Sequence, residues 1–241
     1  LINNSGISWG APLGKFPYHA WDKVMTVNVT GLFHLTQSLL PKLASKATLA
    51  YPSRIINIGS VMGTAALADG PYSYSASKAA SDLLVEAAGR TFDFQYIITR
   101  TCNNFGIDQY EEKFLPTIQK SIKADKEIPV YGDGKQIREW IHVEDNVKAI
   151  LLLMESEHKG VWNIGSDDRW ENIDIVKTIG KVLSKDIKFK YVDDRLGHDR
   201  AYAINSSKFR KAFPQWKTTL TLAQYLLEKE NGFNWFNEQG I

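Results

Sequence analysis

The sequence predicts an α/β fold built on a parallel β-sheet. Its 241 residues are enough for one large domain or two small ones with a sizeable core. Apolar runs rich in β-branched residues, at 54–59 and 94–99, alternate with segments of helical character, at 21–43 and 74–91. Alternation of strand and helix along a chain is typical of a parallel sheet covered by helices.

Composition indicates an ordinary globular protein. Hydrophobic residues make up 44% and charged residues 23% of the chain, and the net charge of +2 gives no argument for nucleic acid or membrane as partner. No apolar run approaches the ~20 residues needed to cross a bilayer. No signal peptide is visible either. We therefore expect a cytoplasmic protein.

Metal and disulfide chemistry are not expected. A single cysteine, Cys102, excludes an internal disulfide framework and a cysteine-based metal cluster. The five histidines show no metal-ligand spacing.

The first hundred residues supply most of the predicted sheet. Residues 1–3 are typical of the end of a buried parallel strand, and the helix 21–43 follows. The strand 54–59 leads through a loop into the helix 74–91, and the strand 94–99 comes next.

After residue 102 the elements become shorter. A short strand at 129–131 is followed by a glycine-rich turn and the approach to a helix. Further elements are predicted at 143–156 (helix), 160–165 (strand), 173–183 (helix), 187–192 (strand) and 220–229 (helix). We therefore divide the chain into a first part, 1–102, and a second part, 103–241.

Tyr74 and Lys78 are four residues apart on a predicted helix and therefore share a face. A lysine ammonium beside a phenol favours the phenolate and lowers a pKa that is ~10 in model peptides. A bare Tyr-x-x-x-Lys pair is more often a packed aromatic beside a solvated lysine. Ser60 at the end of the preceding strand and Asn28 within an apolar helix reverse that balance and favour a proton-transfer site.

Asn28, Ser60, Tyr74 and Lys78 resemble, in order and approximate spacing, the catalytic tetrad of short-chain dehydrogenases/reductases. The segment Leu-Ile-Asn-Asn-Ser-Gly at 1–6 is similar to that family's Asn-Asn-Ala-Gly strand end. The resemblance implies catalytic roles for the four residues and NAD as cofactor, with NADP as the alternative. The residues that it implies contact the cofactor are Asn3, Gly6, Tyr74, Lys78 and Asn104.

The glycine-rich turn of a dinucleotide-binding fold is not found in the sequence. Such a fold opens with a strand, this turn and a helix, where backbone amides cradle the pyrophosphate. Gly6, Gly10 and Gly14 lie close together, but no helix follows them directly, and we interpret them as loop glycines. The resemblance thus implies a partial Rossmann-like, doubly wound sheet with its first half missing, and weak NAD binding by this chain alone.

Six segments from residue 74 onward form an ordered set: Tyr-Ser-Ala-Ser-Lys-Ala-Ala-Ser-Asp at 74–82, Asn-Asn-Phe-Gly at 103–106, Glu-Lys at 112–113, Pro-Val-Tyr-Gly-Asp-Gly-Lys-Gln-Ile-Arg-Glu-Trp at 129–140, Asn-Ile-Gly at 163–165, and Asp-Arg-Leu-Gly-His-Asp-Arg at 194–200. The set resembles the extended branch of the superfamily, specifically nucleotide-diphosphate-glucose 4,6-dehydratases. This resemblance implies a dTDP- or UDP-sugar as partner, and a homodimer. Arginine forks suit a diphosphate. The residues implied to bind the substrate are Asn103, Lys113, Pro129, Tyr131, Arg138, Asn172, Arg195 and His198.

Residues 1 to about 71 resemble a different branch, the single-domain reductases of 3-oxoacyl or similar carbonyl substrates. At the end of the serine strand the dehydratases carry Thr-Asp-Glu, in which the aspartate and glutamate are the elimination acid and base. Ser60, Val61 and Met62 stand there in this chain, and neither Val nor Met can transfer a proton. We therefore hypothesise a chimera, natural or engineered, joined within about 72–80.

Three functions remain open at this point. The first is a dehydratase-like protein with impaired catalysis, the second an NADPH-dependent short-chain ketoreductase. The third is a non-catalytic scaffold or nucleotide-sugar binder.

Overall fold

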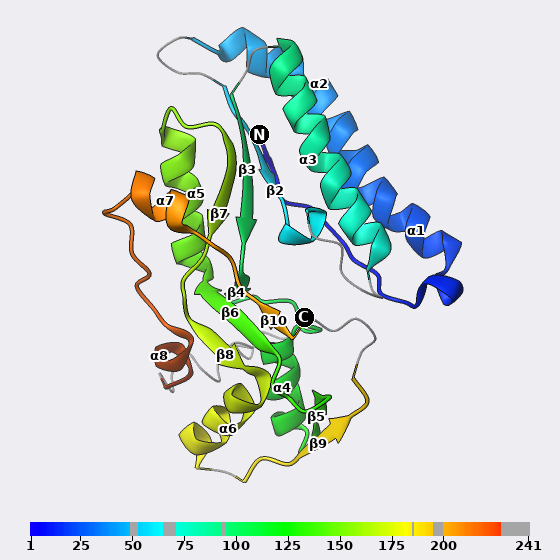
Figure 1. Ribbon diagram of the computed structural model, residues 1–241, viewed down its shortest axis with the longest axis vertical. Coiled ribbons are helices and arrows are strands. Elements are labelled where there is room, and N and C mark those ends of the chain that lie inside the picture. The colour runs from blue at the N-terminus through cyan, green and yellow to red at the C-terminus, as the bar shows by residue number, and fades with distance from the viewer. Residues whose placement is uncertain (49–52, 65–70, 93–94, 185, 195–199, 228–241) are drawn as a thin grey trace. The chain divides into compact units, whose positions relative to one another are not determined.

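The computed structural model describes residues 1–48, 53–64, 71–92, 95–184, 186–194 and 200–227. The chain divides into two compact units (Figure 1). Unit 1 comprises Leu1–Thr101, Ala149–Ile164 and Ser206–Phe213, and unit 2 comprises Cys102–Lys148, Gly165–Asn205 and Pro214–Ile241. The first division falls next to the boundary predicted at 102. Residues 149–164 and 206–213 also belong to unit 1, whereas the predicted division placed every residue after 102 in the second part.

Among the described residues, unit 1 is built on a four-stranded sheet in the order β1-β2-β3-β7. Its strands are β1 (Ile2–Asn3), β2 (Ile55–Ile58), β3 (Tyr96–Thr101) and β7 (Gly160–Ile164). All neighbouring strands are parallel, with Ile2 opposite Ile56 and Ile97 opposite Gly160. Ile56 and Ile97 are completely or almost completely buried, as is typical of central parallel strands. The predicted α/β fold with a parallel sheet is confirmed.

The helices of unit 1 that precede β3 pack with one another, and the last of them also packs on β2 and β3. They are α1 (Tyr18–Met25) with the π-helical segment Thr26–Gly31 and α2 (Leu32–Lys46), and α3 (Tyr72–Phe92). Figure 1 shows α2 and α3 running side by side. The helix predicted at 74–91 is confirmed as α3, whereas the one predicted at 21–43 is two α-helices separated by a π-helical segment. Unit 1 also contains the short 3-10 helices Leu13–Lys15 and Val61–Gly63, and α7 (Ser207–Ala212).

In unit 2, β6 (Ile137–His142) is flanked by β4 (Asn103–Phe105) and β10 (Ala201–Tyr202), which run parallel to it, and by the antiparallel β8 (Arg169–Glu171). A separate parallel pair joins β5 (Ile128–Tyr131) to β9 (Phe189–Val192). The helices are α4 (Phe114–Lys123), α6 (Asn172–Leu183), α8 (Leu222–Leu227) and the start of α5 (Val143–Glu155). Its core includes Phe105, Leu115, Ile118, Trp140 and Ile175.

Two sequence predictions in this region are wrong. Residues 137–142 form the strand β6 rather than the approach to a helix. The strand was missed because Glu139, Trp140 and Ile141 are all buried, so the sequence shows no alternation of buried and exposed residues there. The helix predicted at 143–156 forms as α5, but an apolar face of Val147, Ile150, Leu151 and Met154, which its sequence spacing predicts, is not the buried one: Val147 and Leu151 are 47% and 40% exposed, and Ala149 and Leu153 are buried instead. In the described parts of the chain, every helix is too short or too polar to span a lipid bilayer.

Candidate active site

Three of the four predicted catalytic residues come together at the carboxyl end of β2. Ser60 follows this strand and caps the 3-10 helix, with its Oγ accepting a hydrogen bond from Met62 N at 3.2 Å. Tyr74 and Lys78 reach the same place from α3, and the Ser60 side chain lies near enough to the Tyr74 hydroxyl to lower its pKa. The Lys78 ammonium lies 5.7 Å from the centroid of the Tyr74 ring and donates to the Ile58 carbonyl at 2.8 Å. The arrangement suits proton transfer to or from an oxygen of a bound molecule.

The pKa values of the pair are set mainly by burial. Burial raises the pKa of Tyr74, and the hydrogen bond from Ser60 acts in the opposite direction. Burial lowers the pKa of Lys78, and the negative charge of Asp82 raises it. The prediction that the Tyr74 pKa is lowered is therefore wrong for this structure, because desolvation of the phenolate exceeds the favourable contributions. At neutral pH Tyr74 therefore holds its proton, and it has to lose this proton before it can act as a base.

Asn28 supports this site from the π-helical segment. Its Oδ1 accepts from Ile7 N, and its Nδ2 donates to the Ile7 carbonyl and to Ser77 Oγ, all at 2.9 Å. Asn28 thus ties the loop after β1 to α3, one residue before Lys78. Gly6 lies in the same place, since a Cβ added to it would be 3.4 Å from the Lys78 ammonium. Three predicted residues from distant parts of unit 1 therefore meet here.

Asn3 does not reach these residues by any hydrogen bond described here. Its Nδ2 donates to Asn57 Oδ1 at 2.8 Å and to Thr36 Oγ1 at 3.5 Å, so the side chain is used inside unit 1. The structure thus gives Asn3 contacts that hold β1 against β2 and α2.

The Lys78 ammonium and the Asn104 side-chain oxygen are the two groups that indicate whether NAD fits this chain. An ammonium has three N–H donors, and the Ile58 carbonyl accepts one from Lys78, so the side chain can also serve a ribose. In unit 2, Asn104 Nδ2 donates to the Cys102 carbonyl at 3.2 Å, but its buried Oδ1 accepts no hydrogen bond from the described residues. Such an acceptor fits a ligand N–H or O–H. Lys78 in unit 1 thus fits the nicotinamide ribose of NAD, and Asn104 in unit 2 offers a separate acceptor, whereas the sequence contains no glycine-rich turn for the pyrophosphate.

In unit 2, four predicted substrate residues surround the turn that joins β5 to β6. Pro129 and Tyr131 lie two residues apart on one face of β5. Arg138 lies near the start of β6, where its Nη1 donates to the Ile137 carbonyl at 2.8 Å. Asn172 opens α6, and its backbone N–H donates to the carbonyl of Gln136 in the turn at 3.1 Å. All four side chains are half-buried, so each keeps some access to a ligand.

The other predicted substrate residues are more scattered. Asn103 lies on β4 opposite Trp140 of β6, and Lys113 is exposed just before α4. Arg195 and His198 lie outside the described residues. Just before them, Asp194 Oδ2 accepts from Gln136 Nε2 at 2.9 Å.

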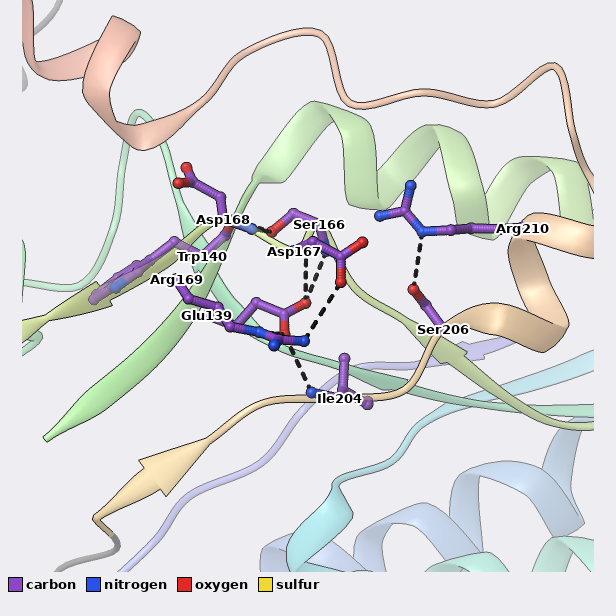
Figure 2. A network of polar contacts seen from close by, with 9 residues as sticks. All are labelled: Glu139, Trp140, Ser166, Asp167, Asp168, Arg169, Ile204, Ser206 and Arg210. Carbon is purple, nitrogen blue, oxygen red and sulfur yellow. Dashed lines mark hydrogen bonds and ion pairs between the residues drawn. The ribbon is translucent and has the colours of Figure 1, made fainter.

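Sequence reasoning missed the network around Glu139, which is completely buried in β6 next to Arg138. Figure 2 shows its carboxylate among donors from two other segments. Oε1 accepts from the backbone N–H groups of Ser166 and Asp167 at 2.9 and 3.2 Å. Oε2 accepts from Ile204 N at 3.2 Å and Arg169 Nε at 3.3 Å. A glutamate inside an apolar strand segment was the available signal, but its partners are remote in sequence.

Gly59 allows close packing at the base of the Tyr74–Lys78 site. A Cβ added here would lie 3.0 Å from Ile98 Cγ2, 3.1 Å from Asp82 Oδ1 and 3.2 Å from the Thr99 carbonyl oxygen. We expect Gly59→Ala to lower the free energy of unfolding by about 1–3 kcal/mol, because the backbone of β3 has to move. Urea denaturation measures this.

Gly14→Ala is the matched control for Gly59→Ala. A Cβ at Gly14 meets nothing within 4 Å, so the change should stay within about 0.5 kcal/mol. Equal stability of the two variants would contradict the tight packing at Gly59.

Comparison with known proteins gives one family match and many relatives. A family model described as "NAD dependent epimerase/dehydratase family" matches residues 26–165. The chain is 42% identical over 147 residues to the low-salt glycan biosynthesis protein Agl12 of Haloferax volcanii, covering 59% of this chain and 47% of the relative. It is also 42% identical over 177 residues to a dTDP-glucose 4,6-dehydratase of Escherichia coli, covering 65% and 49%. The chain thus spans about half the length of these curated relatives.

Solved structures show the same resemblance. The dTDP-glucose 4,6-dehydratase from Bacillus anthracis, in complex with NAD, is 29% identical with a TM-score of 0.75, covering 90% of this chain and 70% of that one. DesIV, a dTDP-glucose 4,6-dehydratase from Streptomyces venezuelae with NAD and TYD bound, has a TM-score of 0.80 and covers 99% and 73%. At 24% identity, the second comparison shows the fold alone. The predicted resemblance in fold and family is confirmed.

Proposed function

Because the chain belongs to the NAD dependent epimerase/dehydratase family, we propose that it recognises a dTDP- or UDP-sugar and carries the redox centre of a 4,6-dehydratase-like reaction without the elimination acid and base. The observation that carries this proposal is the meeting of Ser60, Tyr74 and Lys78 at the end of β2. Relatives named dTDP-glucose 4,6-dehydratase support the substrate class.

The proposed chemistry at this site concerns a sugar hydroxyl, by resemblance the one at C4. NAD, or NADP as the alternative, supplies the hydride acceptor for its oxidation when it is bound. Tyr74, once it has lost its own proton, takes the hydroxyl proton and later returns it, while Ser60 hydrogen-bonds to the same oxygen. Lys78 holds the nicotinamide ribose, and its positive charge favours the phenolate that the first step requires. Asn104 Oδ1 is the further acceptor for the cofactor.

Unit 2 supplies the proposed nucleotide-sugar contacts. Arg138 pairs with the diphosphate through its guanidinium fork, and Arg195 is its proposed partner in this. Pro129 and Tyr131 form an apolar wall against the pyrimidine. Hydrogen bonds to hydroxyl and phosphate oxygens are assigned to Asn103, Lys113, Asn172 and His198.

Loss of the elimination step follows from Val61 and Met62. These two residues form the 3-10 helix directly after Ser60, where the dehydratases carry their acid and base, and neither side chain can transfer a proton. Incubation with dTDP-glucose and NAD should therefore yield no 4-keto-6-deoxy sugar. Mass spectrometry of the sugar nucleotide measures this, with an intact dehydratase as positive control. Formation of that product would contradict the proposed impairment.

A second candidate function is an NADPH-dependent short-chain ketoreductase. The observation in its favour is that Asn28, Ser60, Tyr74 and Lys78 all lie in unit 1, with Asn28 bracing α3. A third candidate is a nucleotide-sugar binder or scaffold without turnover, which is favoured by Val61 and Met62 directly after Ser60, since neither side chain can transfer a proton. Firm NADPH binding supports the second candidate, whereas nucleotide binding without dinucleotide binding supports the third.

The chimeric origin and the homodimer are also proposals. The family match at 26–165 crosses the segment 72–80 at which the two resemblances meet. Sequencing of the parent gene tests the join, and a contiguous dehydratase gene upstream of residue 72 would contradict it. Sedimentation equilibrium tests the dimer.

A further inference from the structure

The buried charge of Lys78 is not balanced by the other predicted catalytic residues. Lys78 is 7% exposed, and its ammonium donates to a neutral backbone carbonyl, that of Ile58. Asn28, Ser60 and Tyr74 are neutral at pH 7. Because an ammonium taken out of water is strongly disfavoured unless it is paired, the compensating charge has to come from elsewhere in unit 1.

Asp82 is in the right place to supply that charge. It lies one helical turn after Lys78 on the same face of α3 and is 6% exposed. Its Oδ2 accepts from Arg100 Nη2 of β3 at 2.9 Å. Its Oδ1 is buried and has no hydrogen-bond partner among the described residues. This oxygen faces the end of β2, since a Cβ added to Gly59 would lie 3.1 Å from it.

We propose that Asp82 is a positioning residue for Lys78, anchored by Arg100, and that its carboxylate keeps the buried ammonium charged at the end of β2 beside Tyr74. The inference rests on the proposed role of Lys78. It does not depend on which sugar nucleotide is bound.

The ionised forms of Asp82 and Lys78 are favoured by the opposite charges beside them. Burial lowers the pKa of Lys78, and the charge of Asp82 opposes this. Burial raises the pKa of Asp82, and the hydrogen bond and charge of Arg100 oppose that, with a smaller contribution from Lys78. Glu86, further along α3, raises the Asp82 pKa slightly. Arg100 thus favours the charged form of Asp82, and Asp82 favours the charged form of Lys78.

Direct titration of Lys78 tests this inference without any cofactor or substrate. Lysine labelled with ¹³C at Cε is followed by NMR against pH, and the Lys78 signal is assigned from its loss in Lys78→Arg. Asp82→Asn is expected to lower the Lys78 midpoint by about 1 pH unit, because an opposite charge nearby is removed. The double variant Asp82→Asn/Arg100→Met should show the same lowering and leaves no unpaired arginine behind.

Glu86→Gln is the matched control, because it removes a negative charge from the same helix one turn further on. It should shift the Lys78 midpoint far less than Asp82→Asn does. Equal Lys78 midpoints in the wild type and both Asp82 variants would overturn the proposal, and the Asp82–Arg100 ion pair would then be a purely structural contact. Loss of the folded state in both Asp82 variants would overturn it as well. Failure of nucleotide binding alone would reject the proposed function but leave this titration unchanged.

Discussion

Replacement of Glu139 by leucine is expected to lower the free energy of unfolding by about 3–5 kcal/mol, the range found when one partner of a buried charge network is removed. The carboxylate is fully buried and accepts four N–H groups. Leucine leaves the backbone donors of Ser166, Asp167 and Ile204 without their acceptor. Glu139→Gln keeps one acceptor oxygen and should lose less.

Urea denaturation of each Glu139 variant measures this effect. Glu111→Gln is the matched control, because Glu111 forms an exposed ion pair with Lys120 in the same unit. An exposed pair of this kind contributes about 0–1 kcal/mol. A Glu139→Leu protein as stable as the control variant would contradict the view that this carboxylate holds β6, the turn before β8 and the segment after β10 together.

Replacement of Arg138 by glutamine is expected to weaken binding of UDP or dTDP by about 10- to 100-fold. A charge-assisted hydrogen bond contributes about 1.5–3 kcal/mol, and each 1.4 kcal/mol is a factor of ten in the dissociation constant. Arg138 is half-buried on β6, and its Nη1 donates to the Ile137 carbonyl at 2.8 Å, which restrains the guanidinium.

Isothermal titration calorimetry with each nucleotide measures the effect at Arg138. Arg90→Gln is the control, because Arg90 is an exposed arginine of α3 in unit 1. Its removal tests for a general effect of positive charge. An unchanged affinity in Arg138→Gln, or an equal loss in both variants, would contradict the proposed diphosphate contact.

The elements that sequence patterns predicted well are those with local signals. The strand at β2 and the helix α3 are specified by apolar runs and by the four-residue spacing of Tyr74 and Lys78, so both were found. β6 was missed because successive side chains in it are buried on both faces. A strand of that kind gives no alternation to detect.

The sequence predicted that Ser60, Tyr74 and Lys78 lie together, but not the electrostatics of the place where they meet; their catalytic roles stay a prediction. The order of Ser60, Tyr74 and Lys78 pointed to one location, and the structure brings them together there. Whether charge or burial sets the Tyr74 pKa depends on packing, which a linear pattern does not contain. The Asp82–Arg100 pair and the Glu139 network join residues far apart in sequence, so neither could be read from local spacing.

Calorimetric titration of the unmodified 241-residue chain with dTDP, UDP, NAD and NADPH tests the central claim most directly. The account predicts that dTDP or UDP binds, and that NAD binds more weakly than either because the chain contains no glycine-rich turn. Firm binding of NADPH with no binding of dTDP or UDP would contradict the account and favour the ketoreductase.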